Sequence, residues 1–209
     1  KLANRDRHVF AALMLAHGHG DGLVTGATRK SAHVLERLNH VFDANAKHGA
    51  VGITALLHKG RIVFIGDTLV HEWPNEEDLA NIAEKGAKVA RHMGLEPRVA
   101  FVSFSTFGYP VSERAEKMQR APDVLDARGV DFEYEGEMTV DVALNAESQK
   151  NYSFSRLTGP ANILVVPARH SASISVKLMQ EMAGATVIGP ILTGLDKSIQ
   201  ICSTTSTAN

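Results

Sequence analysis

The residues best suited to chemistry lie near the C-terminus, where two short apolar stretches flank a glycine-rich loop. Gly189, Pro190 and Gly194 occupy positions at which a backbone turns tightly or lets a ligand come close. Hydroxyl and ammonium groups follow them, and such groups donate hydrogen bonds to an oxyanion. These donors are Thr193, Lys197, Ser203 and Thr204. The stretch predicts one edge of a binding cleft.

Three other clusters carry polar groups. The alternating carboxylates of 131–137 indicate a solvated strand face rather than a catalytic pair, since alternate residues share one face. His17 and His19 with Asp21 fit a polar loop better than a metal site, which normally needs three or four convergent ligands. Asp67 fits a turn residue bonding its own backbone better than a functional acid. Ser171 and Ser173 fit two roles equally well, phosphate binding at a helix N-terminus and ordinary N-capping.

Regular elements must position these groups. Asp6 caps an expected helix whose buried face carries Val9, Phe10, Leu13 and Ala16. The turn Lys59-Gly60 joins two apolar runs into a β-hairpin. The other expected elements are a short strand over 21–27, a helix from Thr28, a helix from Asn75 to Met93, a strand over 98–104, a helix over 112–128, a buried strand over 159–167 and a helix after Ala168.

Composition narrows the function classes. The 209 residues are 44% hydrophobic and 22% charged, with a formal net charge of -1. No long basic run argues for nucleic acid or an anionic membrane as partner. We find no apolar run of spanning length and no secretion signal, and the single cysteine, Cys202, fits a reducing cytoplasm. The chain begins on Lys1 without an initiator Met, so we expect a fragment of a longer protein.

Three stretches resemble the phosphate acetyltransferase family. Residues 189–203 are similar to its G-P-(I/M)-L-Q-G-L-x-K-P-V segment and the following L-S-R-G. Residues 21–27 resemble D-A-D-G-L-V-A-G-A, and residues 94–106 resemble G-(L/I)-E-P-R-V-A-x-(L/V)-S-(F/Y)-S-T. The likeness is closer still to the phosphotransacetylase-like region at the C-terminus of bacterial NADP-dependent malic enzymes, which share F-S-T-F-G-(N/H/Y)-P-x-x-E-R with residues 104–114.

This resemblance implies a fold and a ligand. The implied fold is α/β with three α/β/α layers and two subdomains, as in isocitrate and isopropylmalate dehydrogenases. Residues 1–48 plus 186–209 would form an incomplete first subdomain, and residues 49–185 an inserted second one. The implied ligand is acetyl-CoA, held in a cleft by Asp21, Gly22, Ser105, Thr106, Gly189, Pro190, Thr193, Gly194, Lys197, Ser203 and Thr204.

Departures from the family pattern weaken the case for acyl transfer. Thr204 stands where the family has the arginine of L-S-R-G, and Glu36 stands where it has a second arginine. Arg29 and Arg37 lie close enough in the sequence to substitute for the second. The family's Gly/Ser-rich acyl loop is replaced by bulkier residues from Phe107 onward. Loss of one preorganised charge contact commonly costs about 10²–10³ in rate.

The leading hypothesis is a regulatory, acetyl-CoA-binding domain without a catalytic residue of its own. The resemblance places malate decarboxylation, with NADP and a divalent metal, in a separate N-terminal region of the same polypeptide. It also implies self-association as a homodimer or higher oligomer. One alternative is an active phosphate acetyltransferase. Another is a purely structural oligomerisation module.

Overall fold

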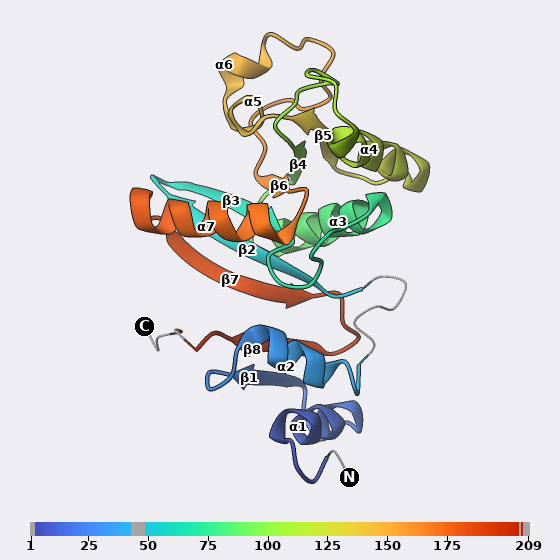
Figure 1. The fold of residues 1–209 in the computed structure, drawn as a ribbon, viewed down its shortest axis with the longest axis vertical. Coiled ribbons are helices and arrows are strands. Elements are labelled where there is room, and N and C mark those ends of the chain that lie inside the picture. Colours follow the sequence, from blue (N-terminus) through green and yellow to red (C-terminus); the bar gives the residue numbers. More distant parts are fainter. Residues whose placement is uncertain (1–2, 43–48, 205, 207–209) are drawn as a thin grey trace.

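The computed structural model describes residues 3–42, 49–204 and 206 (Figure 1), without the side chain of Arg114. Its helices and strands are α1 (Arg7–Ala16), β1 (Gly22–Gly26), α2 (Ser31–Leu38), β2 (Val51–His58), β3 (Arg61–Gly66), α3 (Glu76–His92), β4 (Arg98–Val102), the 3-10 turn η1 (Glu113–Ala115), α4 (Glu116–Arg128), β5 (Glu133–Met138), α5 (Val140–Leu144), α6 (Ala146–Gln149), β6 (Ile163–Val165), α7 (Arg169–Ala183), β7 (Thr186–Thr193) and β8 (Ser198–Cys202).

Six strands form the main sheet, in the order β5-β4-β6-β3-β2-β7. The first four run parallel, whereas β2 pairs antiparallel with β3 and β7. Successive side chains point to opposite faces, so Phe64 and Phe101 join a core under α3 and α4, while Ile65 and Ala100 join a second core under α5 and α7. This confirms the predicted three-layer α/β/α fold.

A smaller unit lies below the main sheet in Figure 1. There β1 and β8 pair in parallel, and α1 and α2 pack beside them around a third apolar core. Leu69 and Leu192 extend this core into the main sheet. The residues 186–193, expected in the first subdomain, are hydrogen-bonded to β2 in the main sheet. The division into two subdomains stays a prediction.

Local sequence signals correctly place several elements. Lys59 and Gly60 both have positive φ, 48° and 74°, as a two-residue hairpin turn requires. Asn75 and Asp78 form a reciprocal capping box at the start of α3. Among the described helices, none combines the length and apolar character needed to cross a bilayer.

The predicted buried face of α1 is correct for Val9 but wrong for Phe10 and Ala16. His8, Val9, Ala12 and Leu15 are buried, whereas Phe10 is 54% exposed. Apolar residues run almost without a break along this helix, so their spacing is compatible with more than one buried face. Contacts with α2 and β1 select the face, and these contacts are long-range.

The predicted solvated acidic face is also partly wrong. Asp131 is exposed and binds Arg91, and Glu133 accepts hydrogen bonds from Thr158. Glu135 and Glu137 are instead buried, at 7% and 1% exposure. The β4–β5 register shifts at Glu137, between Gly136 and Met138, which interrupts the alternation, and the segment after α6 folds over the strand.

Candidate functional site

The structure separates the residues expected to form one cleft. Gly22 pairs with Ser198 at one end of the β1–β8 ladder, and Gly26 pairs with Cys202 at the other. Asp21, Gly22 and Lys197 therefore lie at the amino end of the ladder, whereas Thr193 ends β7 in the main sheet and Gly194 follows it. Ser203 and Thr204 follow the opposite end. Four residue steps of a strand separate the two ends by about 13 Å.

Gly189 and Pro190 lie inside β7, opposite an irregularity in its pairing with β2. Gly189 has φ 121°, and a Cβ there would lie 2.9 Å from the carbonyl oxygen of Ile53. The close approach of the β7 and β2 backbones therefore explains why a glycine occupies this position, without reference to a ligand.

Ser105 and Thr106 follow the carboxyl end of β4. Ser105 is fully buried, and its hydroxyl lies 3.5 Å from that of Ser103. The Thr106 hydroxyl oxygen accepts from the backbone N–H of Thr139 at 3.1 Å. Both hydroxyls thus have contacts within the protein that hold the loop after β4 in place.

A cavity of about 950 Å³ opens at the carboxyl ends of β4 and β6. In open α/β sheets this edge is where ligands bind. Its lining comes from the loop after β3, the strand ends, α4 and the first turn of α7. The lining residues are Trp73, Glu76, Val102, Ser103, Phe104, Glu113, Glu116, Lys117, Val140, Val166, Pro167, Ala168, His170, Ser171 and Ser175.

The cavity has an aromatic and apolar wall. The rings of Trp73 and His170 lie 5.7 Å apart between centroids, and Phe104 contributes a side chain that is 60% exposed. Val102 and Val166 form the base at the strand ends. Such a wall suits the flat or aliphatic part of a ligand.

Lys117 is the one lysine or arginine among the described lining residues. Its ammonium donates to the carbonyl oxygens of Pro74 at 3.1 Å and Pro167 at 2.8 Å, and lies 5.8 Å from the centroid of Trp73. Burial lowers the pKa of the Lys117 ammonium, and the Glu76 carboxylate opposes this shift. Lys117 therefore joins α4 to two loops that frame the cavity.

The first turn of α7 forms another part of the lining. Its N-cap residue is Ala168, which has no side chain able to cap, so neither serine is the N-cap, one of the two roles left open for them. Ser171 lines the cavity, whereas Ser173 does not. The N-terminus of a helix attracts negative charge because its first N–H groups lack intrahelical partners.

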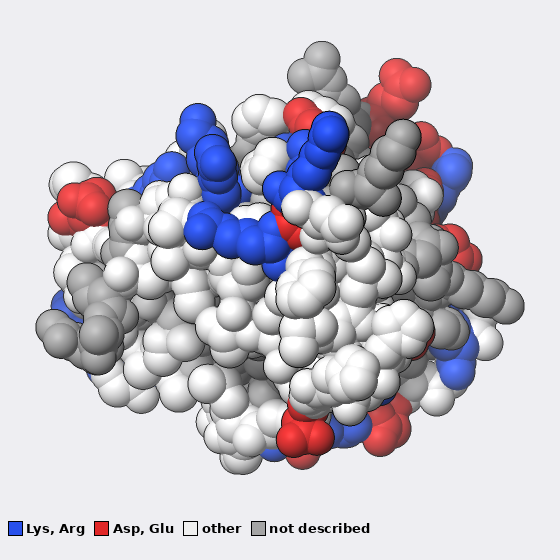
Figure 2. Space-filling model, turned by 90° about the horizontal axis from the view of Figure 1, so that it is seen from below, with Lys and Arg blue, Asp and Glu red and all other residues white. Residues whose placement is uncertain are grey.

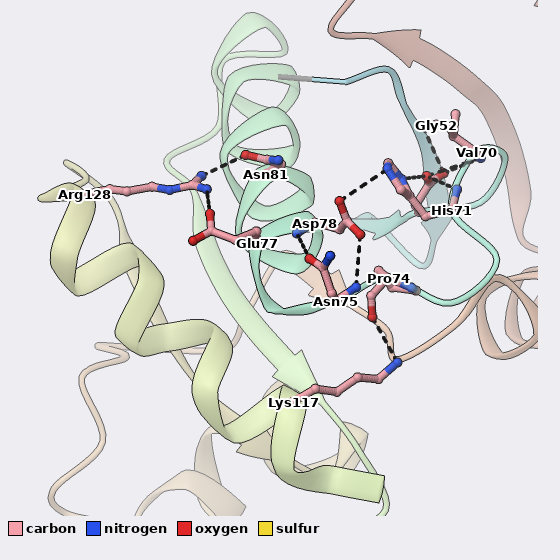
Figure 3. A network of polar contacts seen from close by, with 11 residues as sticks. Gly52, Val70, His71, Pro74, Asn75, Glu77, Asp78, Asn81, Lys117 and Arg128 are labelled. Atoms are coloured by element: carbon pink, nitrogen blue, oxygen red, sulfur yellow. Dashed lines mark hydrogen bonds and ion pairs between the residues drawn. The ribbon is translucent and has the colours of Figure 1, made fainter. Parts of the chain in front are cut away.

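The loop that carries Trp73 is fixed by Asp67, which is 2% exposed. Figure 3 shows three of its partners, Gly52, Val70 and His71. One carboxylate oxygen accepts from the backbone N–H groups of Gly52, Leu69 and Val70, at 2.7–3.1 Å. The other accepts from the backbone N–H and from Nδ1 of His71, at 2.9 and 2.8 Å. The structure confirms that Asp67 bonds its own turn.

His71 makes the stability of this loop depend on pH. Its hydrogen bond to Asp67 raises the pKa of His71 above 6.5, although burial opposes the shift. The folded state then binds the proton more tightly, so this stabilisation is complete below pH about 6.5 and is lost as pH rises through the folded-state pKa. We expect urea unfolding between pH 6 and 9 to show this loss, and His71→Gln to remove it. Equal pH dependence in both proteins would contradict the assignment.

Basic side chains gather on the face at the α1 end of the molecule (Figure 2). Arg7 bonds the Thr28 hydroxyl, and Arg37 lies 3.5 Å from the Asp6 carboxylate. Arg37 is thus engaged in an ion pair with Asp6, whereas Arg29, after β1, is exposed.

Among residues 3–42, 49–204 and 206, no group of three His, Cys, Asp or Glu side chains is placed to hold a metal ion. His17 and His19 instead border a shallow groove beside Phe10 and Met14.

Comparison with known proteins gives a consistent result. The family model for phosphate acetyl/butaryl transferase matches residues 1–209. The NADP-dependent malic enzyme of Rhizobium meliloti is 52% identical over 203 residues, which are 97% of this chain and 27% of that protein. The probable NADP-dependent malic enzyme of Rickettsia prowazekii is 40% identical over 219 residues, 100% of this chain and 29% of that protein. The chain spans less than a third of the length of these two relatives.

Solved structures agree with the family match. A phosphotransacetylase from Streptococcus pyogenes superposes with a TM-score of 0.91 at 26% identity, over 98% of this chain and 63% of that one. EutD phosphotransacetylase from Staphylococcus aureus superposes with a TM-score of 0.84 at 25% identity, over 96% of this chain and 62% of that one. The chain therefore belongs to the phosphate acetyl/butaryl transferase family.

Proposed function

We propose that this chain is the regulatory, acetyl-CoA-binding domain of an NADP-dependent malic enzyme, and that it does not transfer acetyl groups. Oxidative decarboxylation of malate, with NADP and a divalent metal, would be carried by a separate N-terminal region of the polypeptide. The observation that carries the proposal is a large cavity at the carboxyl edge of the sheet in a chain that has Thr204 in place of a charged residue.

The cavity suits a long ligand with distinct chemical parts. Trp73 and Phe104 offer apolar surface to an acyl or pantetheine chain. Glu113 and Glu116 repel negative charge on the α4 side, so we place the phosphates away from α4.

Acyl transfer needs a positive charge that the chain lacks at Thr204. The attack of a thiolate on an acyl phosphate develops negative charge that cationic groups must stabilise. Thr204 follows the exposed end of β8 and carries no charge. We therefore expect no coenzyme A release above the uncatalysed rate when the chain is incubated with acetyl-CoA and inorganic phosphate. Saturable, enzyme-proportional release would favour the alternative, an active phosphate acetyltransferase.

Trp73 gives a direct test of binding, since it is the only tryptophan of the chain and lines the cavity. We expect its emission to change saturably as acetyl-CoA is added. If acetyl-CoA leaves the emission of the folded chain unchanged and calorimetry detects no heat, the structural-module alternative is favoured.

Self-association is the second part of the proposal. Ile174, Leu178 and Met182 recur every four residues on α7 and are 65%, 58% and 79% exposed. An exposed apolar stripe of this kind is typical of an interface between protein subunits, and we propose that a second copy of the chain covers it. Oligomers provide a route by which an effector bound at α7 changes the arrangement of subunits.

Replacement Leu178→Glu tests this interface. Burying an unpaired carboxylate between two copies is costly, so we expect the variant to be monomeric at concentrations where the wild type is dimeric, with the dissociation constant of the dimer raised at least about tenfold. Light scattering with size-exclusion chromatography measures this. Lys177→Glu, beside it on the same helix, is the control. A wild-type monomer, or dimers in both variants, would contradict the assignment.

A further inference from the structure

Lys117 has a hydrogen-bonding geometry that points beyond a structural role. A lysine ammonium has three N–H donors and no acceptor. Within the described part of the chain, two of its donors are taken by the carbonyl oxygens of Pro74 and Pro167, at 3.1 and 2.8 Å. Because the three N–H bonds are arranged tetrahedrally, these two carbonyls fix the direction of the third.

That third donor belongs to a side chain that lines the cavity beside Trp73. The other charged groups lining the cavity are the carboxylates of Glu76, Glu113 and Glu116, together with the titratable ring of His170. Carboxylates offer no donor when ionised. Lys117 is therefore the one lysine or arginine among the described lining residues that can donate to a ligand acceptor.

We propose that Lys117 determines specificity by donating its third N–H to the thioester carbonyl oxygen of the bound acyl-CoA. This inference rests on the proposed function and adds to it the orientation of the ligand. The acyl group lies against Trp73 and Lys117. Coenzyme A without an acyl group has no carbonyl at that position, so the cavity distinguishes the acylated form from the free thiol.

The ratio of the affinities for acetyl-CoA and for coenzyme A tests the proposal. A hydrogen bond from a charged donor to a ligand carbonyl supports a preference of about tenfold for acetyl-CoA over coenzyme A in the wild-type chain. Lys117→Met is expected to reduce this preference to about onefold. Lys117→Arg keeps a charged donor and should retain part of the preference. The matched control is Lys150→Met, which removes an exposed lysine on another part of the chain.

Infrared spectroscopy of acetyl-CoA labelled with ¹³C at the carbonyl gives an independent readout. A hydrogen bond to the carbonyl lowers its stretching frequency, so the bound ligand should absorb at a lower frequency in the wild type than in Lys117→Met. A purely structural role for Lys117 would change both affinities together and leave this frequency unaltered.

These outcomes separate the claim that the chain binds acetyl-CoA from the claim that Lys117 determines specificity. If neither acetyl-CoA nor coenzyme A binds the folded wild-type chain, the proposed function itself is overturned. If both bind and Lys117→Met keeps both the wild-type preference and the wild-type carbonyl frequency, only the specificity assignment is overturned. Circular dichroism confirms that Lys117→Met is folded, and Lys117→Arg supplies the comparison if it is not.

Discussion

Replacement Asp67→Ala is expected to lower the free energy of unfolding by about 3–5 kcal/mol, among the largest effects available in this chain. The buried carboxylate accepts from backbone N–H groups on both β2 and its own loop, and it pairs with His71. Alanine would leave these donors buried without partners, and each such group carries a desolvation cost. Urea unfolding monitored by circular dichroism measures the change.

The matched control for Asp67 is Asp131→Ala. Asp131 also binds a basic side chain, Arg91, but does so on the surface. Exposed ion pairs contribute about 0–1 kcal/mol. Equal effects of the two substitutions would show that the buried network does not hold the loop.

Replacement Trp73→Ala is expected to weaken acetyl-CoA binding by about 10–100-fold. The indole forms one side of the cavity and contacts the ring of His170. It is 69% exposed, so its removal should change the stability of the chain little. Calorimetric titration of the variant with acetyl-CoA measures the loss.

Tyr109→Ala is the control for Trp73, because Tyr109 is an aromatic residue with 82% exposure that does not line the cavity. We expect it to leave the affinity unchanged. If both substitutions weaken binding alike, or neither does, the ligand does not lie against Trp73.

Elements set by neighbouring residues were predictable from the sequence. The hairpin turn at Lys59-Gly60 and the capping box of Asn75 and Asp78 depend on side chains within a few positions. The burial of Glu135 depends instead on Arg156, whose backbone N–H bonds that carboxylate from 21 positions away. Sequence alternation carries no information about such a covering segment.

The candidate site was harder to predict than the fold. Trp73, Lys117 and His170 come from three separate segments, and no motif joins them. Each follows the carboxyl end of a parallel strand or belongs to the helix after it, and such ends meet at one edge of a sheet. That rule could have identified the cavity. The glycines of 189–194, from which the sequence predicts a cleft edge, lie in β7 and just after it and do not line this cavity.

The measurement that tests the central claim most directly is a calorimetric titration of acetyl-CoA into the wild-type chain and into Ser171→Trp. Ser171 lines the cavity at the first turn of α7, and an indole there would occupy ligand space. We predict saturable binding of one acetyl-CoA per wild-type chain, and its loss in a variant that circular dichroism shows to be folded. Absence of binding to the folded wild type, or undiminished binding to Ser171→Trp, would contradict a cavity that binds acetyl-CoA.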